Sequence, residues 1–197
     1  MNKKAERGLA TRQGILETAT RLFAEHGYAG VSIETVLTEC GVSRGALYHH
    51  FAGKEALFEA VFEALEVDLC AQVIARSAGA RDALRGLAAG GEAFLDIAQE
   101  PAMRQIVLID APSVLGWDRW REIETKYGFG LMKASLGRAA DEGALPAEMV
   151  DIYAHMLLAS LSEVALVIAR ADDREAATAQ GKTAMATMLG RLLGSPT

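Results

Sequence analysis

A short segment rich in basic and aromatic residues carries the side chains of this sequence that are best suited to bind a polyanion. It has no acidic residue, and its candidate residues are Arg44, Tyr48, His49, His50 and Lys54. Arginine can read guanine edges with two hydrogen bonds, and tyrosine and histidine can bond phosphates. The segment therefore suits a nucleic-acid surface. The alternative is an ordinary helical corner whose polar face is only solvated.

Two helices joined by a glycine turn must position these residues. Ser32 and Ser43 are good N-caps, because a serine hydroxyl can accept a backbone N–H of the first helical turn. Gly41 can take the left-handed conformation that ends a helix. Helix, short glycine turn and second helix is the layout of a helix-turn-helix unit, whose second helix enters the DNA major groove.

The segment from about residue 11 to residue 62 resembles the N-terminal domain of the TetR (tetracycline repressor) family of bacterial transcriptional regulators. The resemblance rests on ILETATRLFAEHGYAGVSI followed by GVSRGALYHHFAGKEALF. It covers roughly the first third of the chain, and the remainder resembles the family only in length and helical character. The resemblance implies a repressor that binds a double-stranded DNA operator and is released by a small-molecule inducer.

Particular DNA contacts follow from the resemblance. Phosphate contacts are expected from Tyr48, His50, Lys54 and the start of the first helix of the pair, and base contacts from the start of the second. The expected DNA-binding residues are Ser32, Thr35, Ser43, Arg44, Gly45, Ala46, Tyr48, His49, His50 and Lys54. Glu34 stands where many family members have a basic or small residue, which weakens the expectation there. A basic N-terminal arm with Lys3 and Lys4 could also touch DNA.

Composition and charge are compatible with this interpretation. Hydrophobic residues make up 51% of the chain but aromatic residues only 6%, which favours helices over strands. The net charge of −6 lies entirely outside residues 1–60, where seven basic residues balance seven acidic ones. A neutral DNA-binding part with a local basic face can therefore be joined to an acidic body.

The predicted fold class is all-α, with about nine helices. Outside the helix-turn-helix pair, helices are expected at about 11–26, 54–76, 81–99, 102–110, 117–141, 147–169 and 174–193. Glycines in the 117–141 segment could bend or split it. We expect a DNA-binding domain over 1–54 and a ligand-binding and dimerisation domain over 55–197, linked by the helix at 54–76.

No catalytic or metal site is expected. The sequence has no glycine-rich phosphate loop, no zinc-type cysteine pairing and no nucleophile elbow. His49 and His50 are adjacent on a helix and so point in different directions. No cofactor is therefore predicted, apart from an unidentified small-molecule effector. No signal peptide and no run of about 18 apolar residues is found, so the protein is expected to be cytoplasmic, with no membrane partner.

The helix at 147–169 is apolar on nearly all sides and must therefore be covered on all sides. We expect it to pair with the last helix and with a second subunit, giving a homodimer that reads an inverted-repeat operator. The expected dimerisation residues are Leu161, Val164, Ile168, Met185, Met188 and Leu192. The alternative is the central helix of a monomeric bundle.

Apolar and methionine-rich residues of the C-terminal part could line an effector pocket. The candidates are Leu65, Leu69, Phe94, Met103, Val107, Asp110, Trp117, Trp120, Tyr127, Met132, His155 and Met156. For each single residue an ordinary core position is the favoured interpretation, because an aromatic residue or methionine at helical spacing is more often part of a core. Two further functions remain open at this point: a ligand-independent DNA-binding regulator or activator, and an all-helical interaction protein or metabolic enzyme that binds no DNA.

Overall fold

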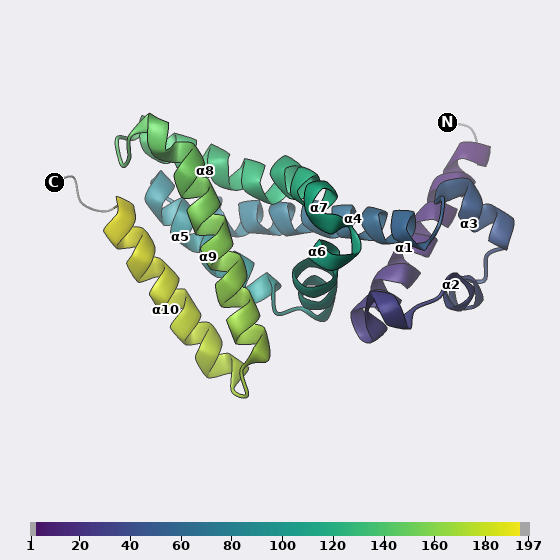
Figure 1. Ribbon diagram of the computed structural model, residues 1–197. Coiled ribbons are helices and arrows are strands. Elements are labelled where there is room, and N and C mark those ends of the chain that lie inside the picture. Colours follow the sequence, from purple (N-terminus) through teal and green to yellow (C-terminus); the bar gives the residue numbers. More distant parts are fainter. Residues whose placement is uncertain (1–2, 194–197) are drawn as a thin grey trace. The chain divides into compact units, whose positions relative to one another are not determined.

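The computed structural model describes residues 3–193, and their regular secondary structure is entirely helical, which confirms the all-α prediction. The elements are α1 (Lys3–Gly30), α2 (Ile33–Cys40), α3 (Arg44–His50), α4 (Lys54–Ser77), α5 (Ala83–Ile97), η1 (Met103–Asp110), α6 (Ala111–Val114), α7 (Gly116–Glu124), η2 (Thr125–Phe129), α8 (Gly130–Asp141), η3 (Ala147–Met149), α9 (Val150–Arg170) and α10 (Arg174–Leu193) (Figure 1).

These helices form two compact units. Among the described residues, unit 1 comprises 3–65 and 101–120, and unit 2 comprises 66–100 and 121–193. This division differs from the expected one after residue 54, because the first half of α4 and the segment 101–120 pack with the N-terminal helices. The helix α4 begins in unit 1 and ends in unit 2.

The core of unit 1 is built around α1. Its apolar face is buried, with Phe23 fully covered. The Phe23 ring meets the Phe58 ring of α4 edge-on, with centroids 5.2 Å apart, and Tyr28 joins this aromatic cluster. The helix is longer than the expected 11–26 segment, because helix-forming residues precede Thr11. The helix is kinked at Gly27, whose φ of 67° is a backbone conformation that glycine adopts without steric cost.

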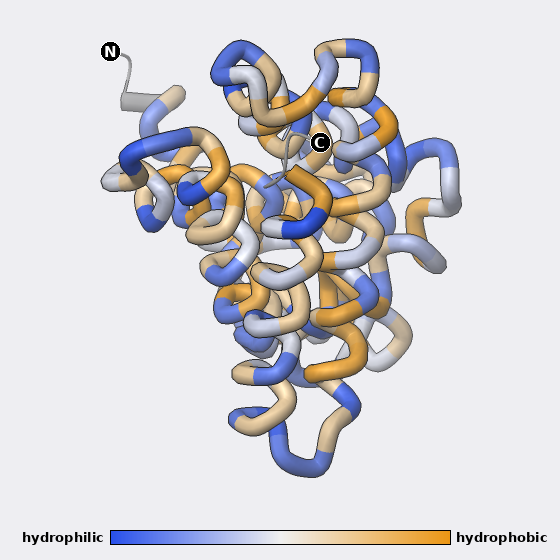
Figure 2. The backbone as a smooth tube through the Cα atoms, turned by 90° about the vertical axis from the view of Figure 1, so that its left-hand side faces the viewer, coloured by the Kyte–Doolittle hydropathy of each residue, from blue (hydrophilic) through white to orange (hydrophobic). Residues whose placement is uncertain are grey.

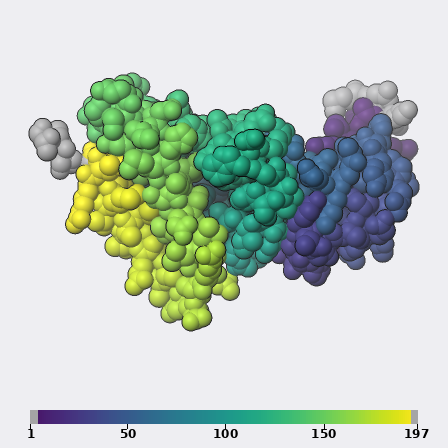
Figure 3. Space-filling model, in the orientation of Figure 1, coloured from purple at the N-terminus to yellow at the C-terminus, as the bar shows by residue number. Residues whose placement is uncertain are grey.

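The core of unit 2 lies between α5, α8, α9 and α10. Its buried members are Ala83, Leu87, Phe129, Leu136, Ala139, Leu145, Ala154, Leu157, Leu158, Leu189 and Leu193. Figure 3 shows α10 lying along α9. A Cβ atom at Gly181 of α10 would come within 2.8 Å of Val164 Cγ1, so glycine permits this close approach. The polar turn between the two helices is the blue segment at the bottom of Figure 2.

The predicted 117–141 helix is interrupted by a π-helical segment. The structure has α7, then the π-helix η2, then α8, without a non-helical break at the junctions. Gly128 lies within η2 and Gly130 directly after it, whereas Gly137 lies inside α8. π-Segments are rare and often occur at functional sites, and η2 is such a segment in unit 2.

Within residues 3–193, one helical stretch, Ala147–Arg170, is long and apolar enough to cross a membrane by length and composition. The core helix of a soluble bundle passes the same test. Only 33% of its most apolar window is buried within the described protein, so much of its apolar surface is left for another contact.

Candidate nucleic-acid interface and polar core

The first turn of α2 is fixed by the side chain of Ser32. The Ser32 hydroxyl accepts a hydrogen bond from the Thr35 backbone N–H at 3.0 Å, and the two hydroxyls lie 2.8 Å apart. This confirms the predicted N-cap. Both side chains remain exposed, so their hydroxyls can still reach a partner in solution.

The turn between α2 and α3 also has the predicted geometry. Gly41 has φ 66° and ψ 22°, and its N–H donates to the carbonyl of Leu37 at 3.0 Å. The Ser43 hydroxyl then accepts the Ala46 N–H at 3.2 Å and caps α3. Two serine caps and one left-handed glycine therefore set the directions of both helices.

The helix α3 is anchored by one residue and otherwise presents its surface. Leu47 is fully buried, whereas Arg44, Gly45, Tyr48 and His49 are exposed. Ala46 and His50 are half-buried. The His49 and His50 rings lie 5.1 Å apart at a steep angle. The expected base-reading side chains, and Tyr48 and His50 among the expected phosphate contacts, thus come from one short helix with a single apolar anchor.

Arg44 is ion-paired across the two helices. Its Nη2 atom lies 2.6 Å from Oε1 of Glu34 in the first turn of α2. The backbone N–H of Glu34 and the Arg44 guanidinium lower the pKa of the Glu34 carboxyl. The residue that departs from the usual family pattern is therefore paired with the expected base reader.

Lys54, at the start of α4, lies over an aromatic ring. Its Nζ atom is 4.0 Å from the centroid of the Tyr28 ring, and partial burial lowers the pKa of the Lys54 ammonium. This cation–π contact holds the ammonium group close to the first turn of α4, where backbone N–H groups favour an anion.

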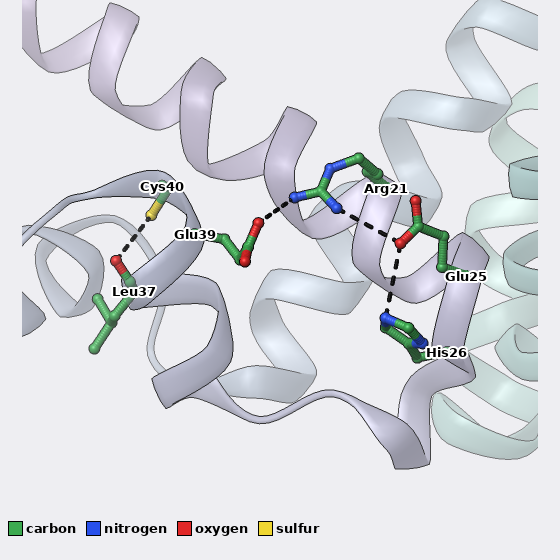
Figure 4. A network of polar contacts seen from close by, with 6 residues as sticks. All are labelled: Arg21, Glu25, His26, Leu37, Glu39 and Cys40. Atoms are coloured by element: carbon green, nitrogen blue, oxygen red, sulfur yellow. Dashed lines mark hydrogen bonds and ion pairs between the residues drawn. The ribbon is translucent and has the colours of Figure 1, made fainter.

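A second arginine ties α1 to α2. Figure 4 shows Arg21 between Glu25 of its own helix and Glu39 of α2. The Arg21 Nη2 to Glu39 Oε2 distance is 2.7 Å, and both side chains are about half exposed. His26 lies 3.7 Å from the same Glu25 carboxylate. The network links α2 to α1 through exposed side chains. The side chains of the predicted arm residues Lys3 and Lys4 lie outside the described part of the structure.

Asp110 joins the segment 101–120 to the break in α1. Its Oδ2 atom accepts the Tyr28 backbone N–H at 2.7 Å, and its Oδ1 atom accepts from the Gln105 amide at 3.1 Å. A Cβ atom at Gly27 would meet both side chains at 3.4–3.6 Å. Asp110 was a predicted pocket residue, but its carboxylate is engaged within unit 1.

Unit 2 contains two buried carboxyl groups that the sequence analysis did not select. Glu66 is 5% exposed and Glu124 is 9% exposed. Burial, reinforced by the charge of Glu124, raises the pKa of Glu66 to about 8, while a hydrogen bond from the Gly128 backbone opposes this. Burial also raises the pKa of Glu124. The ion pair with Arg121 and the nearby His155 act in the opposite direction and lower it by less.

The same region holds Cys70. Burial, and after it the charge of Glu66, raises the pKa of the Cys70 thiol to about 11. The region also holds the Phe129 ring, stacked on His155 with centroids 4.3 Å apart. Polar groups from α4, α7, η2 and α9 therefore meet in unit 2, beside the π-segment. No group of three or more His, Cys, Asp or Glu in the described part of the chain is placed to hold a metal ion.

The predicted pocket residues are divided between the units. Leu65, Met103, Val107, Asp110, Trp117 and Trp120 belong to unit 1, and Leu69, Phe94, Tyr127, Met132, His155 and Met156 to unit 2. Trp117 is 63% exposed and Met156 is 50% exposed, so neither lines an enclosed space within its unit. These assignments remain predictions.

A groove of about 370 Å³, which includes space open to solvent, lies in unit 2 between α5, α8, α9 and α10. Its lining is mostly apolar, with Glu92 and Lys182 as the charged members. It includes Met132 from the predicted pocket, and Leu161 and Met185 from the predicted dimer set.

The predicted dimerisation residues are not equally accessible. Leu161 and Ile168 are 4% and 1% exposed in a single chain, so their surface is already covered within unit 2. Val164, Met185, Met188 and Leu192 are half-buried. The exposed apolar side chains of α9 are Ile152, Met156 and Val167, at 50%, 50% and 57%.

These features define a class of protein: an all-α protein with a capped helix-turn-helix in one unit and a helical bundle in the other. Two family models match the chain. Residues 15–61 match the model described as bacterial regulatory proteins, tetR family, and residues 84–192 match a tetracyclin repressor-like C-terminal domain.

Individual relatives agree with these matches. The HTH-type transcriptional repressor AcnR of Corynebacterium diphtheriae is 32% identical over 75% of this chain and 76% of its own. A TetR-family transcriptional regulator from Pectobacterium atrosepticum is 32% identical over the full length of both chains, with a TM-score of 0.80. FadR from Bacillus subtilis, solved in complex with stearoyl-CoA, is 15% identical, covers 90% of this chain and 96% of its own, and has a TM-score of 0.76.

The chain belongs to the TetR family, and it is a DNA-binding transcriptional regulator with a helix-turn-helix. Regulators of this family bind operator DNA and small-molecule ligands, typically as dimers.

Proposed function

We propose that this regulator is a homodimeric repressor that reads an inverted-repeat operator through α3 and leaves it when a small molecule binds unit 2. The observation that carries the proposal is the surface of α3. Exposed Arg44, Tyr48 and His49 project from a helix that buried Leu47 and the N-cap Ser43 hold in place. That AcnR is a repressor supports the sign of regulation.

DNA binding by these residues can be tested with a duplex that the full-length protein selects from a random-sequence library. Arg44→Ala should weaken binding to this duplex by about 1–3 kcal/mol and relax the sequence preference. Lys54→Ala should weaken binding to the selected duplex and to a scrambled duplex by the same factor. It should also reduce the slope of log affinity against log salt concentration by about one. Unchanged affinity in both variants would show that this face does not bind the DNA.

The dimer is proposed to form through α9 and α10. The side chains of Ile152, Met156 and Val167 are half or more exposed and give α9 an apolar surface that the described residues of a single chain leave open. A charge there, as in Met156→Glu or Val167→Glu, should split the dimer at micromolar concentration in light scattering. Leu9→Glu is the matched control, because Leu9 is 66% exposed and lies on α1. A monomeric wild-type protein would contradict the proposal.

The effector is proposed to bind in unit 2. FadR, which shares the fold, was solved with stearoyl-CoA, so this fold can accommodate a small molecule. Since α4 runs from unit 1 into unit 2, a ligand that prefers one arrangement of α4 can alter operator affinity. Linkage requires reciprocity: the operator must weaken ligand binding by the factor by which the ligand weakens operator binding. Titrating each candidate compound with and without saturating duplex tests this, and equal affinities rule that compound out.

A further inference from the structure

We propose that Glu34 is a specificity-determining positioning residue, which holds Arg44 for base edges and keeps it from phosphates. The proposal rests on the DNA interface proposed above, because it assumes that Arg44 faces the bases. Glu34 itself is not proposed to contact DNA.

The geometry of the pair is the first support. The Glu34 Oε1 to Arg44 Nη2 distance is 2.6 Å, and the contact joins the first turn of α2 to the first turn of α3. The N-caps Ser32 and Ser43 fix both backbones directly beside the pair. The Glu34 and Arg44 side chains are 63% and 60% exposed, so the pair lies on the surface that α3 presents.

The chemistry of the two groups is the second support. A guanidinium group has five N–H donors in a fixed plane, so an arginine that gives one nitrogen to a carboxylate still has donors for guanine O6 and N7. The same carboxylate stands at the N-terminus of α2, where backbone N–H groups would otherwise attract a phosphate. Its charge repels phosphates there and competes with them for Arg44.

This arrangement affects affinity and specificity in opposite directions. A free arginine can pair with any phosphate, and such contacts carry no sequence information. A tethered arginine contributes less to binding of arbitrary DNA but remains able to read guanine. Glu34 should therefore lower the affinity for all sequences while raising the ratio between the preferred duplex and a scrambled one.

The test compares full-length Glu34→Gln with Glu39→Gln. The control removes the same charge from the same helix and breaks an arginine pair of similar length, 2.7 Å, but its partner Arg21 is on α1. Binding is measured by fluorescence anisotropy on the library-selected duplex and on a scrambled duplex, at 50 and 200 mM salt.

Glu34→Gln should bind the scrambled duplex several-fold more tightly, and the selected-to-scrambled ratio should fall. Raising the salt from 50 to 200 mM weakens DNA binding by a certain factor. Each phosphate that Arg44 newly binds in Glu34→Gln should make that factor about 3-fold larger. Glu39→Gln should change both duplexes by the same factor and leave the ratio as in wild type. Both variants should unfold at the same temperature, since each loses one exposed ion pair.

A double variant separates positioning from simple charge removal. In an Arg44→Ala background, Glu34→Gln should no longer change the ratio, because the residue that it positions is gone. A ratio that falls equally with and without Arg44, or equally in Glu39→Gln, would overturn the inference. If Arg44→Ala leaves the affinity for the selected duplex unchanged, the proposed interface is wrong. If Arg44→Ala weakens binding but Glu34→Gln does not alter the selected-to-scrambled ratio, only the proposed role of Glu34 is wrong.

Discussion

Three acidic side chains of unit 1 and two of unit 2 are held in opposite environments. In unit 1, Glu34 and Glu39 are exposed and each pairs with an arginine, and Asp110 accepts two hydrogen bonds. In unit 2, Glu66 and Glu124 are almost fully buried, and burial raises the pKa of each carboxyl. Unit 1 uses its carboxylates to fix the positions of helices and side chains. Unit 2 contains carboxyl groups whose ionised form is disfavoured, so the charge state of unit 2 is coupled to its folding.

The largest expected effect follows from Glu66. Its pKa is raised from 4.5 to about 8, so the folded state holds the proton more tightly than the unfolded state. The contribution of the protonated Glu66 to the free energy of unfolding is therefore fully present below pH 4.5, and it is lost as the pH rises towards 8. At pH 7, which is 2.5 pH units above the pKa of 4.5 in the unfolded chain, this loss is at most about 3 kcal/mol, because each pH unit corresponds to about 1.4 kcal/mol. Glu66→Gln should stabilise the protein at pH 7–8 but not at pH 4.5, in urea unfolding at each pH.

The exposed carboxylate of Glu92, on α5, supplies the control for this prediction. Glu92→Gln removes the same charge from unit 2 without removing a buried group, so the pH dependence should stay close to that of wild type. A gain for Glu66→Gln that is equal at pH 4.5 and pH 8 would indicate better packing of the amide, not relief from ionisation.

The second effect should have the opposite sign and lies in unit 1. Asp110→Ala leaves the Tyr28 N–H without its carboxylate partner, and hydrogen bonds to charged groups contribute about 1.5–3 kcal/mol. The variant should be less stable, and the Tyr28 amide should exchange with solvent faster in hydrogen-exchange mass spectrometry. Asp110→Asn keeps an oxygen acceptor and should lose much less. A variant Asp110→Ala with wild-type exchange at Tyr28 would remove the contrast between the units.

A smaller effect is expected where unit 1 depends on backbone conformation alone. Gly41 has φ 66°, and a Cβ atom there would meet nothing within 4 Å. Gly41→Ala should therefore cost about 1 kcal/mol through the left-handed backbone and not through a clash. Gly41→Asn should cost less, because asparagine tolerates this region. Thermal unfolding of the two variants measures the difference, and equal losses would point to a contact of the glycine that the structure does not contain.

Local chemistry explains which parts of the molecule could be predicted from sequence. The caps at Ser32 and Ser43 and the left-handed turn at Gly41 depend on residues within three or four positions, and the structure confirms all three. The break at Gly27 falls directly after the predicted 11–26 helix, and it too depends on a local residue. The positions at which these residues meet DNA remain predictions.

The parts that were missed depend on contacts between distant residues. Asp110 meets Tyr28 across 82 positions in the sequence, so no local pattern could assign the segment 101–120 to unit 1. Glu66 did carry a signal: it lies four residues after Phe62 and three before Leu69, both buried on α4. A carboxyl group on an apolar helical face indicates a buried charge. Such spacing cannot show that a backbone N–H from a π-segment would reach it.

The smallest expected effect concerns the exposed ion pairs of unit 1. Arg21 and Glu39 are 49% and 46% exposed, and Arg44 and Glu34 are exposed still more. Exposed pairs contribute about 0–1 kcal/mol, because solvent screens the charges and ordering two long side chains costs entropy. Glu39→Gln should therefore change the free energy of unfolding by less than about 1 kcal/mol, and Glu34→Gln should leave it close to that of wild type. Urea unfolding measures this, with Asp110→Ala as the reference for a carboxylate that does stabilise. A loss as large as that of Asp110→Ala would mean that the pairs hold unit 1 together. It would remove the distinction between a carboxylate that stabilises unit 1 and carboxylates that only orient their arginines.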